Sequence, residues 1–124
     1  MISHVIRTAI LATIYAASVP DLAGARTIYD GEWSVLIVTE RGVCDRAYRY
    51  GVQIIDGIVS YQGSGSINFT GRVANDGRVQ VNVAAGDKQA IGRGRLSRTT
   101  GQGSWTGVSQ SSGACQGHWT AERR

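Results

Sequence analysis

The chain has 124 residues, of which 13 are Lys or Arg and 9 are Asp or Glu, so its formal net charge is +4. This length suits a single domain, and the 17 glycines together with the absence of helical spacing exclude a helical bundle. Two cysteines without a nearby cluster of histidines make a poor zinc site, so we expect no metal and no cofactor.

Residues 1–25 have the three parts of a secretory signal peptide. Arg7 provides the positive charge, residues 8–19 are largely apolar, and Ala23 and Ala25 provide the small side chains before a cleavage site. The apolar part has about 12 residues, whereas a membrane-spanning helix needs about 20, so an uncleaved anchor is the less favoured alternative. We predict cleavage after Ala25, a mature domain of residues 26–124 without a transmembrane segment, and a periplasmic or secreted location.

Eight segments of the mature domain alternate apolar and polar residues with the period of two that is typical of β-strands. Turn signals such as Asp56-Gly57, Asn75-Asp76-Gly77 and Gly86-Asp87 separate most of them. Because short connections pair consecutive strands antiparallel, we predict an all-β fold, an eight-stranded antiparallel up-and-down barrel, with a two-sheet β-sandwich as the alternative. The segments are residues 33–38, 48–54, 58–61, 67–73, 78–85, 90–96, 103–107 and 118–122.

Cys44 and Cys115 are the two cysteines of the chain, and an even pair in a small exported domain usually forms a disulfide. They lie 71 residues apart, and the chain-entropy model assigns a loop of that size about 4 kcal/mol. The predicted bond joins the end of the first strand to the start of the last, and these strands are neighbours in a closed barrel. Two buried free thiols and a pair of metal ligands are the alternatives.

The alternation places seven aromatic rings on the inward side of the strands. The interior of an eight-stranded barrel is just wide enough for side chains to fill. We therefore expect a mostly filled barrel with at most a shallow open end, and a lined ligand cup is the alternative. Glycines in the later strands leave room for the two later tryptophans. The seven rings are Trp33, Tyr48, Tyr50, Tyr61, Phe69, Trp105 and Trp119.

The same alternation places Arg72, Arg78, Arg93 and Arg95 on the outer side of neighbouring strands. A guanidinium group binds carboxylate or phosphate through two parallel hydrogen bonds. We therefore predict a basic patch that binds an anionic glycan, lipopolysaccharide or an acidic protein, and we expect no nucleic-acid partner for an exported protein. A solvated outer wall without a ligand is the alternative.

Gly31-Glu32-Trp33 begins the first predicted strand, and Arg123 ends the last. Together with the predicted barrel, these residues resemble the calycin-type small barrels: lipocalins, avidins and the secreted metalloprotease inhibitors of bacteria. The resemblance implies that the Trp33 indole packs over the barrel floor and that Arg123 or Arg124 covers its ring. A disulfide from the first strand to the last departs from the more local disulfide of the inhibitors.

The mature domain contains no convincing catalytic constellation. His118 is its one histidine, it points outward by alternation, and no nucleophile accompanies it, so we expect no enzyme. The leading hypothesis is an exported, non-enzymatic binding module for a glycan, an anionic polymer or a protein. The alternatives are a protease inhibitor that uses residues 26–30 or a loop as its plug, and a barrel that binds a small ligand. The candidate binding residues are Trp33, Tyr48, Tyr50 and Trp105, with Arg72, Arg78, Arg93 and Arg95.

Overall fold

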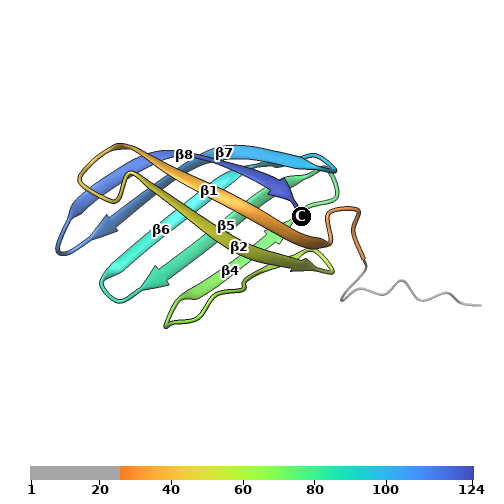
Figure 1. The fold of residues 1–124 in the computed structure, drawn as a ribbon, viewed down its shortest axis with the longest axis horizontal. Coiled ribbons are helices and arrows are strands. Elements are labelled where there is room, and N and C mark those ends of the chain that lie inside the picture. Colours follow the sequence, from red (N-terminus) through yellow and green to blue (C-terminus); the bar gives the residue numbers. More distant parts are fainter. Residues whose placement is uncertain (1–25) are drawn as a thin grey trace, which may run out of the picture.

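The computed structural model describes residues 26–124, which form a closed barrel of eight antiparallel strands in up-and-down order (Figure 1). Each strand pairs with its sequence neighbours, and β1 pairs with β8 to close the sheet. This confirms the predicted barrel; the predicted signal peptide falls on residues 1–25 and lies outside the described residues. The strands are β1 (Gly31–Arg41), β2 (Ala47–Ile55), β3 (Ile58–Tyr61), β4 (Asn68–Val73), β5 (Arg78–Ala85), β6 (Lys88–Leu96), β7 (Thr100–Ser109) and β8 (Gly113–Arg123).

The tight turns lie where the turn residues predict them. Asp56 and Gly57, between β2 and β3, have φ angles of 53° and 79°, as a two-residue hairpin turn with two left-handed positions requires. Gly77 and Gly86 also have positive φ, at 92° and 62°, and they connect β4 to β5 and β5 to β6. Such turns force consecutive strands to pair, so local chemistry determines most of the strand order.

A floor built around Trp33 closes one end of the barrel. The Trp33 side chain is only 1% exposed, and its indole Nε1 donates a hydrogen bond to the Tyr29 carbonyl at 2.9 Å. The Arg123 guanidinium carbon lies 4.9 Å from the centroid of the Trp33 ring, and this group also donates to the carbonyls of Ile28 and Asp30. The arrangement implied for Trp33 and Arg123 is therefore present.

Asp30 fixes the segment before β1 to the hairpin between β2 and β3. Its carboxylate accepts hydrogen bonds from the backbone N–H groups of Asp56 at 2.7 Å and Gly57 at 3.1 Å, and from the Thr27 hydroxyl at 2.6 Å. Burial alone raises the pKa of the Asp30 carboxyl, but the hydrogen bonds outweigh it and hold this pKa below its usual value of 3.8.

We expect Asp30→Ala to lower the free energy of unfolding by about 2 kcal/mol at neutral pH, because three donors lose a charged acceptor. A carboxyl whose pKa is lowered in the folded state stabilises the fold above its unfolded pKa, and this contribution is lost as the pH falls through the folded pKa. Urea unfolding across a pH series should therefore show the wild-type advantage shrinking below about pH 4. A difference that stays constant down to pH 2 would contradict the role given to the Asp30 charge.

Glycines on β6 and β7 make room for the indole of Trp119. Side chains added at Gly94 and Gly103 would place a Cβ atom 2.5 Å and 2.7 Å from the ring. The indole therefore lies flat against bare backbone, and its Nε1 donates to the Arg93 carbonyl at 3.3 Å. The predicted role of these glycines is confirmed.

Candidate ligand cavity

The barrel encloses a cavity of about 280 Å³ that reaches from the floor to an open end. The expectation of a mostly filled barrel is thus wrong. The reason lies in the inward positions near the open half of β6 and β7, where Ala90, Gly92 and Gly107 project little or nothing into the interior. Six of the seven aromatic rings predicted to face inward line the space without filling it, while Tyr61 is not among the lining residues, and aliphatic side chains complete the wall. These are mainly Val35, Ile37, Val52, Val79, Val81 and Val83.

All four aromatic residues predicted to bind a ligand line this cavity. Trp33 forms its floor, Tyr48 and Tyr50 line it from β2, and Trp105 lines it from β7. The indole Nε1 of Trp105 donates to the Val38 carbonyl at 3.0 Å, so its polar atom is satisfied and its ring faces the cavity as an apolar surface. The interior therefore offers a solute many apolar contacts and few hydrogen-bonding groups.

The barrel sheet has its shortest run of backbone pairing between β3 and β4. The short strand β3 pairs with β4 through only two residue pairs, Ile58 with Arg72 and Val59 with Gly71. Toward the open end, a row of rings lies where the ladder stops: ring centroids are 5.7 Å apart for Tyr50 and Tyr61 and 6.2 Å apart for Tyr61 and Phe69. Aromatic packing replaces backbone pairing at this side of the mouth.

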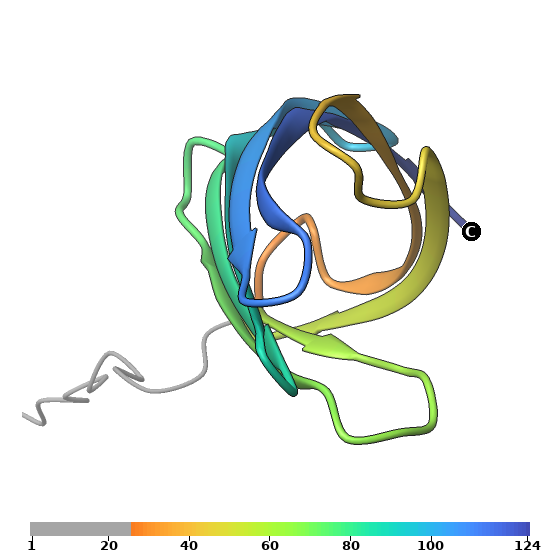
Figure 2. The same ribbon diagram turned by 90° about the vertical axis from the view of Figure 1, so that its left-hand side faces the viewer.

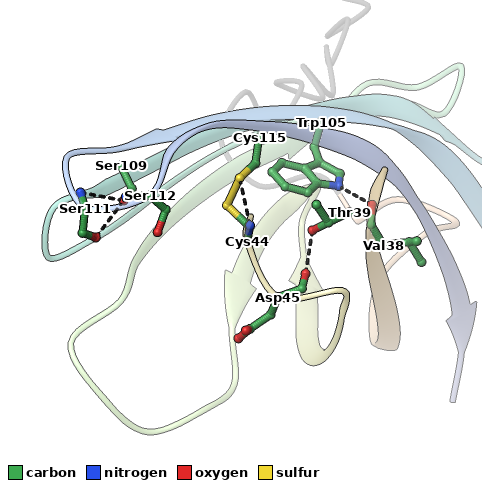
Figure 3. Close-up of a disulfide and its surroundings, with 9 residues drawn as sticks. All are labelled: Val38, Thr39, Cys44, Asp45, Trp105, Ser109, Ser111, Ser112 and Cys115. Carbon is green, nitrogen blue, oxygen red and sulfur yellow. Dashed lines mark hydrogen bonds between the residues drawn. A yellow bond between two sulfur atoms is a disulfide. The ribbon is translucent and has the colours of Figure 1, made fainter. Parts of the chain in front are cut away.

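The loop between β1 and β2, residues 42–46, folds over part of the open end (Figure 2). A disulfide joins Cys44 in this loop to Cys115 on the inner face of β8, with 6.2 Å between their Cα atoms, which confirms the predicted pairing. Cys44 lies in the loop and not on the first strand. Thr39 is buried and donates from its hydroxyl to the Asp45 carbonyl at 2.6 Å (Figure 3). The Thr39 N–H also donates to the Arg46 carbonyl at 2.9 Å, so the disulfide and two hydrogen bonds of Thr39 hold the loop in place.

Polar and charged groups gather at the mouth. Asp45 from the β1–β2 loop lines the opening, together with Lys88 and Gln89 at the start of β6 and Ser112 in the β7–β8 connection. A hydrogen bond to the Asp45 carboxylate, together with its charge, raises the pKa of the Tyr48 hydroxyl, while burial raises the pKa of Tyr50. Both tyrosines stay neutral at physiological pH. The cavity is thus apolar in depth and polar at its rim.

The four predicted arginines lie outside the cavity, on the outer wall. Arg72, Arg78, Arg93 and Arg95 are all exposed, and the strand register brings them onto adjacent strands: Arg78 is opposite Arg95, while Gln80 lies between Arg72 and Arg93. The structure therefore separates the predicted site residues into two sets, four inside the barrel and four on its surface.

The segment proposed as an inhibitory plug is not free. Tyr29 is only 6% exposed, Asp30 caps the β2–β3 hairpin, and Arg123 binds the carbonyls of Ile28 and Asp30. Residues 27–30 serve the floor of the barrel. Only Arg26 and Ile28 of this segment are exposed, so the segment cannot extend into a protease cleft without dismantling the floor.

Several residues at the two sites are not evident from the sequence. The mouth residues Asp45 and Lys88 precede or follow turns, and no periodicity signals their position. Gly92 and Ala90 could have indicated the cavity from the sequence, because small residues at inward positions leave space in the interior. Among residues 26–124, no group of three or more His, Cys, Asp or Glu side chains is placed to hold a metal ion.

Within the same part of the chain, no helix is long and apolar enough to span a membrane. The disulfide indicates an oxidising, exported environment. Comparison of the sequence with protein-family models and with curated proteins gave no match, and comparison of the fold with solved structures gave none either. The architecture is consistent with a calycin-like barrel.

Proposed function

We propose that this protein is an exported, non-enzymatic carrier that binds a small apolar molecule inside its barrel, in the manner of a calycin-like fold. The observation that supports this function is the cavity of about 280 Å³ with an apolar lining and an open, polar mouth. Binding sites for small molecules are concave and mostly apolar, with a few polar groups that orient the ligand. A signal peptide cleaved after Ala25 and a periplasmic or secreted location accord with the disulfide.

The cavity volume limits the size of the ligand. An engineered apolar cavity of about 150 Å³ holds benzene, and a water molecule takes about 30 Å³ of liquid. With a similar volume for each heavy atom, a cavity of about 280 Å³ holds a group of about nine heavy atoms. An alkyl chain of about eight carbons or a fused pair of rings meets this limit, and a larger polar part would remain at the mouth.

Gly92 provides a test that leaves the fold intact. A Cβ atom added at Gly92 would lie 3.7 Å from the Trp119 ring nitrogen, an ordinary contact, and Gly92 lines the cavity. Gly92→Leu would add about four heavy atoms, or about 120 Å³, to the interior. We expect this variant to bind 1-octanol at least tenfold more weakly than the wild type in isothermal titration calorimetry, because less than two thirds of the space remains.

Thr106→Leu is the matched control, since it adds a leucine to the exposed outer face of β7. It should bind octanol as the wild type does, and both variants should unfold at or above the wild-type temperature. Wild-type binding should show a negative heat-capacity change, the mark of apolar burial. Equal octanol affinity for wild type and Gly92→Leu would overturn the cavity as the binding site.

A further inference from the structure

The outer face of β5–β8 is polar and cationic across four neighbouring strands. One row of directly paired residues runs Arg78, Arg95, Gln102 and Thr120. The next row runs Gln80, Arg93, Ser104 and His118. All eight are exposed. Side chains in such rows stand about 5 Å apart across strands and about 7 Å apart along them.

A depression lies in the middle of these rows. Gly94 and Gly103 face each other at its base, and the strands approach so closely there that a Cβ atom at either glycine would overlap backbone atoms of the other strand. The base is therefore bare backbone, with the Trp119 ring behind it. We call this depression and its rim the polar wall; its lining side chains are Arg78, Arg95, Gln102, His118 and Thr120, and Arg93 stands beside it.

The positive charge of the polar wall is only partly compensated. The Asp76 carboxylate lies 2.8 Å from Arg78 Nε, and the Glu40 carboxylate lies 3.1 Å from His118 Nδ1. A backbone hydrogen bond from Arg78 and, more weakly, the charge of Arg95 lower the pKa of Asp76, and Glu122 lies on the same outer face of β8, two residues from Thr120. Neither Arg93 nor Arg95 forms an ion pair with any of the residues 26–124; the Arg93 Nε instead donates to the Gln80 side chain at 3.4 Å. Two guanidinium groups thus remain available for an anion.

We propose that the polar wall binds an acidic polysaccharide. Guanidinium groups can take up its carboxylate or sulfate groups in pairs of hydrogen bonds, and the amide and hydroxyl groups of Gln102, Ser104 and Thr120 can bind sugar hydroxyls. A polymer repeats its anionic groups, so several weak contacts combine through a high effective concentration. The exposed rows of this face hold no aromatic side chain on which unpaired bases could stack, which disfavours single-stranded nucleic acid. This surface site is independent of the cavity.

Arg93 and Arg95 allow a charge-matched test. Arg93→Gln with Arg95→Gln removes two charges from the polar wall, and Arg49→Gln with Arg124→Gln removes two from the outer side near β2, four strands away around the barrel. With a heparin hexasaccharide and an oligogalacturonate as probes, we expect the first pair to weaken binding at least tenfold and the second pair less than twofold. Octanol binding should be unchanged in both.

Three results would overturn the polysaccharide site. Equal losses for the two double variants would mean that net charge alone attracts the probes. Absence of binding at physiological salt would remove the site altogether. Equal affinity for a duplex DNA of the same length would show that the wall recognises anions without regard to the polysaccharide. Because octanol binding is measured in the same samples, a failure here is distinguishable from a failure of the carrier function.

Discussion

Replacing Trp33 with alanine is expected to lower the free energy of unfolding by about 5 kcal/mol. Removal of a buried Trp or Phe side chain costs about 3–5 kcal/mol through lost burial and the cavity that remains. Trp33 adds two further contributions, since its Nε1 bonds to the Tyr29 carbonyl and its ring lies under the Arg123 guanidinium. A hydrogen bond contributes about 1 kcal/mol. The free energy of unfolding of a small domain is about 5–15 kcal/mol, so such a loss is about a third of it or more.

Chemical unfolding followed by circular dichroism measures this effect. Trp33→Phe is the graded control, because it keeps an aromatic ring on the floor and loses only the indole N–H and part of the volume. It should fall between wild type and alanine. A loss below about 1 kcal/mol for Trp33→Ala would show that the floor does not join the segment before β1 to the end of β8.

Removing the disulfide is the second large change. We expect the double variant Cys44→Ala with Cys115→Ala to be destabilised by about 4 kcal/mol, because the bond closes a loop across 71 positions and restricts the unfolded chain. The variant should also lose order in residues 42–46, which only the Thr39 hydroxyl and the Thr39 and Arg46 backbone groups then hold. Urea unfolding under oxidising conditions gives the free-energy difference.

Wild-type protein reduced with dithiothreitol separates the covalent link from side-chain packing. It retains both sulfur atoms, and Cys115 is buried, so packing is largely unchanged. If the link itself stabilises the fold, the reduced wild type and the double variant should lose similar amounts. A double variant as stable as the oxidised wild type would contradict this role of the bond.

The strand order was predictable because it depends on local chemistry. Asp56 and Gly57 adopt positive φ, and short turns of this kind leave the next strand no partner but the one before it. The alternation also placed Trp33, Tyr50 and Trp105 inside the barrel correctly, whereas Tyr48 lines the cavity at its mouth and is 44% exposed. The floor contact between Trp33 and Arg123 followed from the resemblance rather than from periodicity.

The cavity was not predictable, because its volume is the small difference between two large volumes: that of the barrel interior and that of the side chains that point into it. Strand tilt and register set the interior diameter of a barrel, and neither can be derived from alternation alone.

The polar wall was predictable in its charged residues but not in its shape. Parity placed Arg78, Arg93 and Arg95 outside, but the depression between them depends on the close approach of Gly94 and Gly103, a property of the β6–β7 register.

An accessible apolar interior is the basis of the proposed carrier function, and a crystal of the disulfide-bonded protein pressurised with xenon tests for it most directly. Xenon enters dry apolar cavities and leaves strong electron density. We predict a xenon peak inside the barrel, among Tyr50, Val81 and Trp105, with the surrounding side chains unmoved. Side chains that close the interior, with no xenon density between them, would contradict it.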